Sequence, residues 1–348
     1  MRKTSFIVSV AFIALCSILS LLAYVIIDDQ SPFANNQKAE IALKDPGFST
    51  NTILLKNNRF SSAPSFIQKM LHGAEAPYDE YPIKSITIEE KQIITTTYYE
   101  QEKVFQFDDL YTPSFNSIEE ITSEKRYILG TDRFGRSISS RLLLGIRISL
   151  IVGFIAVLIS VSIGILLGSI GGYFGGFVDR VIMYIINVMW ALPTILLVFA
   201  IVIAFGRGMT VIFIAVGLTM WVDVARIVRG QVKKIKEEQF IVAAKSMGFD
   251  HSRIIVRHVL PNIVGPVLVI AAANFATAIL IEAGLSYLGF GVKPPTPSIG
   301  NMLNEHYGYA ITGKPFLAFV PAIAIMLLVL AFNLIGTGLR DWFDVKSE

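Results

Sequence analysis

The sequence contains little cysteine, little histidine and little charge. Its single cysteine, Cys16, excludes a disulfide within the chain and a metal site built from several thiolates. The four histidines have no metal-ligand spacing. Asp, Glu, Lys and Arg together make up 16% of the 348 residues, and the formal net charge of +3 is too small to indicate a nucleic-acid partner.

The sequence also lacks a nucleotide-binding loop. Residues 308–314 have the glycine and lysine spacing of a phosphate-binding loop, but Pro315 occupies the position of the Ser or Thr that would hold magnesium. A glycine cluster at 168–176 has no strand–turn–helix frame around it, which excludes a dinucleotide site. We therefore predict that the chain is not an enzyme, has no catalytic residues, and itself binds no cofactor and no metal.

Apolar residues dominate what is present. They make up 53% of the chain, and the mean hydropathy is +0.59. Six runs approach or exceed the roughly 20 residues that a bilayer requires. They are residues 6–27, 149–170, 181–204, 208–225, 264–288 and 316–335. We predict an all-α polytopic membrane protein with six transmembrane helices.

The first apolar run, residues 6–27, is longer than the core of a signal peptide. Leu15, which precedes Cys16, is too large for a lipoprotein cleavage site. We therefore expect residues 1–27 to form a retained N-terminal transmembrane helix rather than a cleaved signal.

Basic residues are concentrated between the fourth and fifth apolar runs. That loop holds eight Lys or Arg residues, whereas the other short loops hold one or two. The eight are Arg226, Arg229, Lys233, Lys234, Lys236, Lys245, Arg253 and Arg257. Because short cytoplasmic loops are enriched in Lys and Arg, we expect this loop and both termini to be cytoplasmic.

Residues 28–128 are polar and balanced in charge. β-Branched and aromatic residues predict short strands at 85–88, 92–99 and 103–107, and residues 65–72 favour a helix. We predict a small β-containing extracytoplasmic insert. An irregular loop is the alternative interpretation of the same composition.

The stretch that follows, residues 129–150, has helix signals. Thr131 or Asp132 can cap a helix on which Arg136, Arg141 and Arg147 lie near one face. We expect this helix to lie along the membrane surface, with its arginines near lipid phosphates.

Two acidic residues fall within or near the apolar runs. Asp223 lies near the end of the fourth run, where Arg226 can pair with it. Glu282 lies deeper, and an intramembrane acid indicates either a functional site or a structural partner, here Arg207. The residues alone do not decide between these two roles.

Pro193, three residues after Trp190, should kink the third span. A kinked helix can line a pathway or fill a core, and both interpretations stay open. As candidates for a translocation pathway we take Trp190, Pro193, Glu282 and Ser286.

The polar stretch 240–262 predicts a helix, a turn and a second helix. Gly248 lies where a left-handed C-terminal cap belongs, Asp250 can cap the second helix, and Pro261 should end it. The small residues Ala243 and Ala244 leave a shallow surface that a partner protein could contact. A loop helix lying on the membrane is the alternative.

This stretch resembles the coupling motif of binding-protein-dependent ABC importer permeases. The matching residues are Ala243, Ala244, Gly248, Ile254, Leu260 and Pro261. Val242 departs from the pattern, because the family has Glu there. The resemblance implies that this loop contacts a cytoplasmic ATPase subunit. The implied contact residues are Phe240, Ala243, Ala244, Met247, Gly248, Ile254, Leu260 and Pro261.

Further segments are similar to the second permease of the dipeptide, oligopeptide and nickel group. They include Gly-Thr-Asp at 130–132, Gly-Arg at 135–136, and residues around Glu282 and Asn333. The resemblance covers residues 129–344, with a coupling loop at 232–262. It implies the six-helix type I importer permease fold, in a multi-pass protein of the bacterial inner membrane.

The resemblance also implies a function. The chain would be the permease subunit of an ATP-driven importer that translocates di- or oligopeptides. Its implied partners are a homologous second permease, two cytoplasmic ATPase subunits that hold ATP and magnesium, an extracytoplasmic substrate-binding protein and membrane lipid. Nickel import is the alternative within the family. A secondary transporter and a membrane-anchored binding module are the rival classes.

Overall fold

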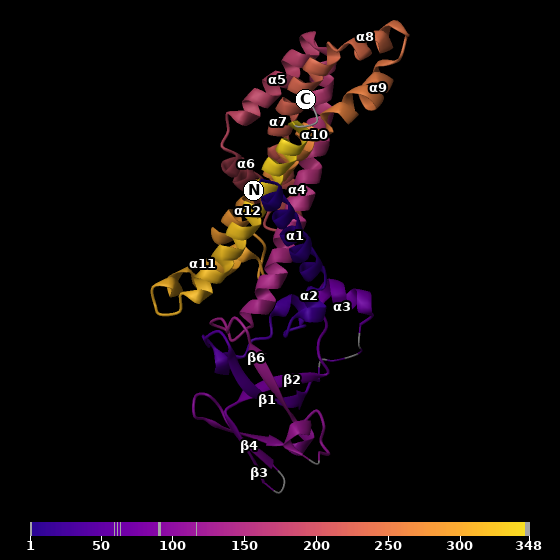
Figure 1. Ribbon diagram of the computed structural model, residues 1–348. Helices are drawn as coiled ribbons and strands as arrows, with labels where there is room; N and C mark the ends of the chain where they lie inside the picture. The colour runs from indigo at the N-terminus through magenta and orange to yellow at the C-terminus, as the bar shows by residue number, and fades with distance from the viewer. Residues whose placement is uncertain are drawn as a thin grey trace.

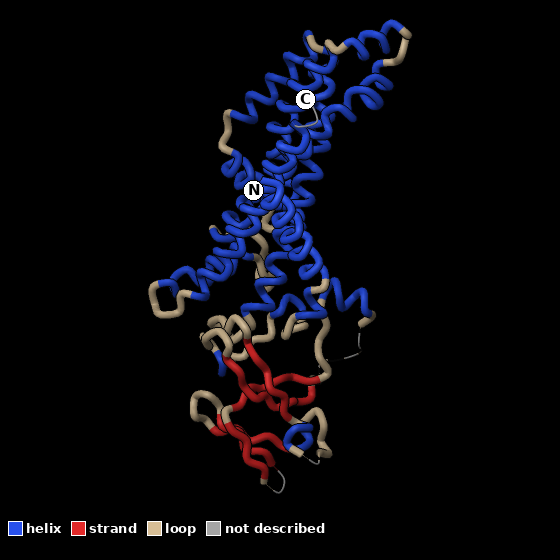
Figure 2. The backbone as a smooth tube through the Cα atoms, viewed as in Figure 1, coloured by secondary structure: helices blue, strands red, loops and turns tan. Residues whose placement is uncertain are grey.

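The computed structural model describes residues 2–58, 60, 62, 64–89, 92–115 and 117–344. Long helices lie side by side in an elongated helical part, and a smaller β-containing part extends from one end of it (Figure 1). Figure 2 shows that the strands are confined to that end, which we call the sheet end.

The helical part contains eight of the twelve α-helices found in the described ranges. They are α1 (Arg2–Leu21), α2 (Ala23–Ile26), α4 (Ile138–Phe174), α5 (Gly176–Trp190), α6 (Thr194–Phe205), α7 (Met209–Lys236), α10 (Leu260–Tyr287) and α12 (Phe316–Asp344). The other four helices are α3 (Phe66–His72), α8 (Gln239–Ser246), α9 (His251–Ile254) and α11 (Ile299–His306).

Five helical segments of the described chain are long and apolar enough to cross a membrane. They are residues Lys3–Leu21, Ile138–Phe174, Met209–Lys236, His251–Tyr287 and Phe316–Phe343. A sixth crossing exists only if α5 and α6, which meet at an angle of 85°, form one broken span. The membrane helices are thus five, or six with the bent pair.

The bend between α5 and α6 has a local cause. Pro193 lies directly before Thr194, the first residue of α6. Its ring fixes φ and removes the backbone N–H that a continuous helix would need. The structure therefore bends the chain where the sequence predicts a kink.

A stripe of small residues brings α4 against α7. Gly164, Gly168 and Gly172 recur every four residues on one face of α4. A Cβ atom added to Gly168 would lie 2.6 Å from the carbonyl oxygen of Ala225, and one added to Gly172 would lie 2.8 Å from that of Arg229. The two backbones are thus in contact, as small-residue stripes allow in membranes. Helix α10 packs on both helices, α12 packs on α10, and α1 packs on α12.

The β-containing part has two antiparallel three-stranded sheets. Their strand orders are β2–β1–β6 and β3–β4–β5. The strands are β1 (Phe48–Lys56), β2 (Tyr78–Ile83), β3 (Ser85–Ile88), β4 (Gln92–Thr96), β5 (Glu102–Gln106) and β6 (Thr122–Tyr127). Ile53, Ile83 and Ile93 are buried in one cluster that draws on both sheets, so the two sheets share a core.

Three of the six strands, β3, β4 and β5, lie where the sequence predicts strands. The first sheet has a weaker signal, because β6 reads Thr-Ser-Glu-Lys-Arg-Tyr and β2 contains Pro82. Both strands pair with β1, and the register that joins Phe48 to Tyr127 spans 79 positions of sequence. Such pairing depends on partners that a local pattern does not reveal.

The prediction of a surface helix beginning at Thr131 or Asp132 is wrong. Helix α4 begins at Ile138, and Ser137 is its N-cap, with its hydroxyl accepting from the Ser140 amide at 3.4 Å. Asp132 instead closes a turn, in which it accepts hydrogen bonds from the amides of Phe134 and Arg136 at 2.9 Å. Asp132, predicted as a helix cap, therefore stabilises a turn that precedes the helix.

The placement of the arginines near lipid phosphates is wrong for two of the three. Arg136 and Arg141 are 4% and 2% exposed. Arg136 donates to Asp132 at 2.6 Å and to Glu305 of α11 at 2.7 Å. These two acids, one local and one distant in sequence, draw the guanidinium groups into the protein.

Candidate functional site: a surface elbow

Two short helices form an elbow, which we define as residues 239–260. It comprises α8, α9 and a π-helical turn at Ile255–Val259. Figure 1 shows that α8 and α9 project beyond the long helices at the end opposite the sheets. We call this the elbow end of the molecule.

The turn of the elbow is closed by backbone hydrogen bonds. Gly248 has a φ of +78°, a conformation that glycine adopts without penalty. The Gly248 amide donates to the Lys245 carbonyl at 2.9 Å, and the Phe249 amide donates to the Ala244 carbonyl at 3.2 Å. This pair of bonds is the Schellman motif. The predicted glycine cap is therefore present.

Asp250 begins the second helix of the elbow. Its carboxylate accepts a hydrogen bond from the Ser252 amide at 3.0 Å, as the sequence predicts. Hydrogen bonds from the Ser252 hydroxyl and amide lower the pKa of Asp250. The cap is therefore charged at neutral pH and fixes where α9 starts.

Buried apolar side chains anchor the elbow to the long helices. Ile241, Ala244 and Ile254 are 0%, 2% and 0% exposed, and they pack with Val232 of α7 and Val259. Ala244 and Ile254 were expected in a partner contact, but their side chains face inward. Ile241 and Ala244 lie three residues apart on one face of α8, and together with Ile254 of α9 they hold the elbow in place.

A second face of the elbow is exposed and apolar. Phe240 and Met247 are 45% and 66% exposed. Ala243, which lies between them in the sequence, and Gly248, which follows Met247, are also exposed. These four residues, which we call the elbow face, form a surface on which a partner could pack. Of the remaining predicted residues, Pro261 is exposed and Leu260 is half-buried.

The elbow also carries exposed basic groups. Lys245, Arg253 and Arg257 are exposed, and the two arginines line a shallow hollow together with Ser252 and Val256. Arg253 also lies over the Phe249 ring at 4.3 Å. The elbow therefore suits a partner surface that combines apolar and acidic groups.

Polar contacts join the elbow end to its neighbours. The Tyr173 hydroxyl, near the end of α4, lies 3.0 Å from His251 Nδ1 of α9. Asp179 of α5 accepts from Arg229 Nη2 of α7 at 2.8 Å and from Lys233 at 2.7 Å. These contacts could not be predicted from local sequence patterns, because each joins positions 50 or more apart.

The second helix of the elbow does not end at Pro261, so that prediction is wrong. The segment His251–Tyr287 is helical throughout, and Pro261 lies in the first turn of α10. The preceding π turn, Ile255–Val259, widens the helix where the proline ring would otherwise meet a carbonyl oxygen. The elbow is therefore joined directly to the membrane helix α10.

The four predicted pathway residues fall into two separate environments. The side chains of Trp190 and Pro193 are exposed at the α5–α6 bend. Arg226 lies over the Trp190 ring at 4.0 Å, not against Asp223 as predicted. Glu282 and Ser286 of α10 are 0% and 1% exposed.

Glu282 has hydroxyl partners rather than a basic one. Its carboxylate accepts from Ser149 at 3.1 Å and from Ser286 at 2.8 Å, and Ser298 also donates to it. The suggested partner, Arg207, lies over the Phe290 ring at 4.8 Å. The pairing of Glu282 with Arg207 is therefore wrong, and the acid links α4, α10 and the segment before α11.

A cluster of three polar side chains at the sheet end has the residue types of a metal site. The ligand atoms of Asp132, Glu305 and His306 lie within 4.8 Å of one another. Arg136 already pairs with both carboxylates, and Arg141 lies 3.9 Å from each. The cluster therefore offers a cation little uncompensated negative charge.

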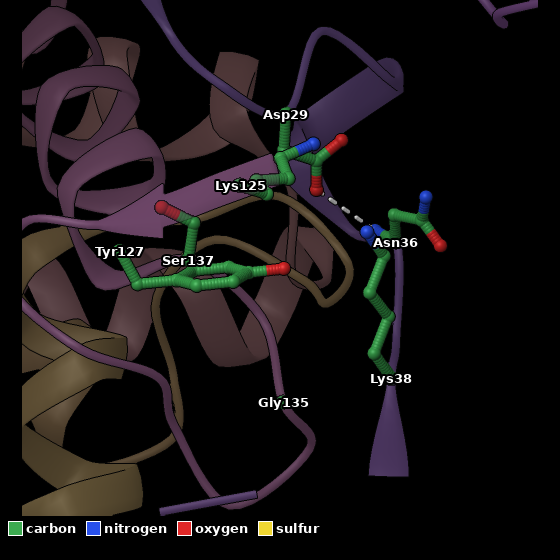
Figure 3. A pocket seen from close by; sticks show the side chains of 7 residues that line it. All are labelled: Asp29, Asn36, Lys38, Lys125, Tyr127, Gly135 and Ser137. Carbon is green, nitrogen blue, oxygen red and sulfur yellow. Dashed lines mark hydrogen bonds between the residues drawn. The ribbon is translucent and has the colours of Figure 1, made fainter. Parts of the chain in front are cut away.

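A small cavity lies nearby, where the start of the insert meets β6 (Figure 3). There the Asp29 carboxylate accepts a hydrogen bond from the backbone amide of Asn36 at 3.1 Å, which fixes the chain that follows α2. The Tyr127 hydroxyl is buried beside this cavity and has no hydrogen-bond partner in the described structure. Such an orphaned hydroxyl fits an ordered water.

The described structure defines a class of protein: a polytopic helical membrane protein with an anchored elbow at one end. The chain belongs to the family of binding-protein-dependent transport system inner membrane components, whose family model matches residues 164–347. The matched range contains the elbow. The resemblance to ABC importer permeases is therefore confirmed, and the chain is an inner-membrane permease component.

Curated relatives carry names from the peptide branch of this family. The dipeptide transport system permease protein of Alkalihalophilus pseudofirmus is 43% identical over 63% of this chain and 72% of its own length. The glutathione transport system permease protein of Shigella flexneri is 43% identical over 72% of this chain and 79% of its own. The oligopeptide transport system permease protein of Bacillus subtilis is 39% identical over 64% and 72%.

Among solved structures, a chain of the inward-facing MetNI methionine ABC transporter aligns with a TM-score of 0.46. It is 18% identical and covers 59% of this chain and 95% of its own.

Proposed function

We propose that this protein is the membrane-spanning permease subunit of an ATP-driven importer of di- or oligopeptides. In this proposal an extracytoplasmic binding protein delivers the peptide, and a homologous second permease completes the pathway. Family membership supports the importer class. The relatives named for dipeptide, glutathione and oligopeptide transport support the substrate class over nickel.

The anchored elbow with its exposed face is the observation that carries the proposal. Its inner residues are fixed against the long helices, whereas Phe240, Ala243, Met247 and Gly248 are exposed. An ATPase subunit that packs on this face can move α7 and α10 together, since the elbow is continuous with both. ATP and magnesium bind in that partner, and this chain contributes no catalytic group.

The proposal fixes an orientation. The elbow and both termini are cytoplasmic, and the sheets, which lie at the other end of the helical part (Figure 1), are extracytoplasmic. The basic residues at 226–257 support this orientation. Membrane-impermeant labelling of a cysteine introduced at Glu100 in intact cells, and at Met247 only after permeabilisation, tests it.

The coupling role is tested in the assembled complex. The chain is coexpressed with its second permease and two ATPase subunits, and the binding-protein-stimulated ATPase rate is measured in proteoliposomes. The double variant Phe240→Asp, Met247→Asp places two charges in an apolar contact. Stimulation should fall at least tenfold, which corresponds to a loss of about 1.4 kcal/mol or more in the free energy of the contact. Val104→Asp is the matched control, because Val104 is 52% exposed but lies in β5. An unchanged rate in the double variant would refute the elbow contact.

The substrate is tested by uptake. Cells lacking the chain should lose accumulation of a radiolabelled dipeptide or tripeptide and regain it on complementation, with nickel-63 uptake unaffected. Loss of nickel uptake alone would replace peptides with nickel. Peptide uptake by the purified single chain, driven by an ion gradient without ATPase partners, would replace the importer class with a secondary transporter.

A further inference from the structure

The short helix α3 is strongly amphipathic. Phe66, Ile67, Met70 and Leu71 occupy one continuous arc of the helix, whereas Gln68, Lys69 and His72 occupy the other. Ser65 and Gln68 form a capping box that fixes the start of the helix. The apolar arc is largely uncovered, since Phe66, Ile67 and Leu71 are 65%, 64% and 47% exposed.

Three contacts fix α3 against the ends of the membrane helices. Arg147 of α4 donates to the Met70 carbonyl at 3.0 Å, and its guanidinium lies over the Tyr24 ring at 5.8 Å. Gly73 packs directly on the same Tyr24 ring. The Ala74 amide donates to the Gln30 carbonyl at 2.8 Å. Helix α3 therefore has a defined position beside α2 (Figure 1).

The depth of that position in a bilayer follows from the neighbouring segments. The first apolar span ends at Leu21, and Tyr24 lies one turn beyond it. Tyrosine is enriched at the boundary between headgroups and acyl chains, and arginine can anchor a helix at the same level. Tyr24 therefore lies at the level of this boundary, although its side chain packs inside the protein and is 4% exposed. Both Tyr24 and the half-buried Arg147 contact the α3 region.

The end of α1 and the neighbouring helix α2 also expose apolar side chains. Leu21, Val25 and Ile26, at the end of α1 and in α2, are 57%, 42% and 51% exposed. Leu21 ends the first span and Val25 and Ile26 lie just beyond it, so exposed apolar side chains reach the level of the boundary on α2 as well as on α3. Lys69 and His72 lie on the other arc of α3, where an interfacial helix carries its basic residues.

We propose that α3 is a lipid-binding interfacial helix, which lies in the bilayer surface at the sheet end and ties the β-containing part to the membrane. Its occupant is lipid, with acyl chains against Phe66, Ile67 and Leu71 and anionic headgroups near Lys69. The inference is independent of the transported substrate and of the elbow.

Spin labels test this placement in the full-length chain. Single cysteines are introduced at Ile67 and Leu71 on the apolar arc, and at Gln68 and His72 on the polar arc, in a Cys16→Ala background. The protein is placed in nanodiscs of phosphatidylethanolamine and phosphatidylglycerol. Collision rates of each label with oxygen, which concentrates in acyl chains, and with a water-soluble nickel chelate are then measured.

The expected result is an oxygen-to-nickel ratio several-fold higher at 67 and 71 than at 68 and 72. A ratio that favours the nickel chelate at all four positions would place α3 in water and overturn the proposal. Low collision rates with both reagents at 67 and 71 would show that protein covers the apolar arc, which also overturns it. No outcome depends on transport activity, so failure here leaves the importer assignment intact.

Discussion

A single buried acid joins three segments of the helical part. Glu282 of α10 is fully buried and is bonded by Ser149 of α4, Ser286 one turn away, and Ser298 before α11. Its unusual position was evident in the sequence, but its partners were not. Serines are common in apolar helices, and 133 residues separate Ser149 from Glu282.

The hydrogen bonds of Glu282, rather than a charge pair, should determine its effect on stability. Glu282→Gln keeps an acceptor and a donor for the serine hydroxyls, so the melting temperature in detergent should change little. Glu282→Leu removes every acceptor, and each buried hydroxyl left unpaired costs about 1–3 kcal/mol. We therefore expect a clearly lower melting temperature for the Leu variant. Equal losses in both variants would show that the carboxylate charge itself is required.

His306 predicts a pH dependence of stability. Its side chain is fully buried, and burial is the main cause that lowers its pKa below the ordinary value of 6.5. Asp132 and Glu305 oppose this shift, and Arg141 and Arg136 add to it. Below pH 6.5 the unfolded chain therefore binds a proton that the folded chain resists.

Stability should consequently fall as the pH drops through 6.5. The loss approaches about 1.4 kcal/mol for each pH unit in which only the unfolded state is protonated. Melting temperatures at about pH 7.5 and about pH 5.5 measure it, and His306→Gln should reduce the difference between them. A difference of the same size in both proteins would assign the pH dependence to other groups.

At the scale of elements, local signals predicted the turn of the elbow and the bend between α5 and α6. A glycine cap, an acidic N-cap and the bend at Pro193 each depend on neighbours within a few residues, and the structure has all three. The failures involve distant partners or longer-range geometry. Arg136 is buried because Glu305 is near it, and Pro261 is tolerated because a π turn precedes it.

The elbow turn should tolerate only residues that adopt a positive φ at position 248. Gly248→Pro fixes φ near about −65°, opposite in sign to the +78° observed, and should destroy the Schellman turn. Gly248→Asn is the matched control, because Asn enters the left-handed region at small cost. Both chains should still insert in the membrane. Only the Pro variant should lose binding-protein-stimulated ATPase activity in the complex, and full activity in that variant would contradict the coupling role.

The contact between α4 and α7 allows a comparison of one substitution at two sites. Gly168→Ala places a methyl group 2.6 Å from the Ala225 carbonyl oxygen, so the helices must separate. Overpacking of this kind costs about 1–3 kcal/mol. Gly230→Ala meets nothing within 4 Å and should be neutral or stabilising by up to about 1 kcal/mol. Thermal unfolding of the purified chains distinguishes the two, and equal melting temperatures would show that α4 and α7 are not tightly packed.

At the scale of the whole molecule, the sheets and the helices meet through a shared connection. Residues 29–46 run beside the loop at 130–137, where the Lys38 amide donates to the Phe134 carbonyl at 2.9 Å and the Leu43 amide donates to the Asp132 carbonyl at 3.0 Å. This connection therefore belongs structurally to the helical part. Composition revealed a polar insert, but not that its first residues pack with the start of α4.

The sheets can therefore be removed without removing that connection. Phe48 and Tyr127 are registered partners on adjacent strands, so replacing residues 49–126 with a Gly–Gly turn closes the gap between them. The main clusters of buried residues in the helical part lie outside the deleted range. The shortened chain should thus insert, remain monodisperse in detergent and copurify with the ATPase subunits. A deletion of residues 30–120 instead removes Asn35 and Lys38, which bond to the loop at 130–137, and should aggregate. If both deletions aggregate alike, the helical part depends on the sheets for its own folding.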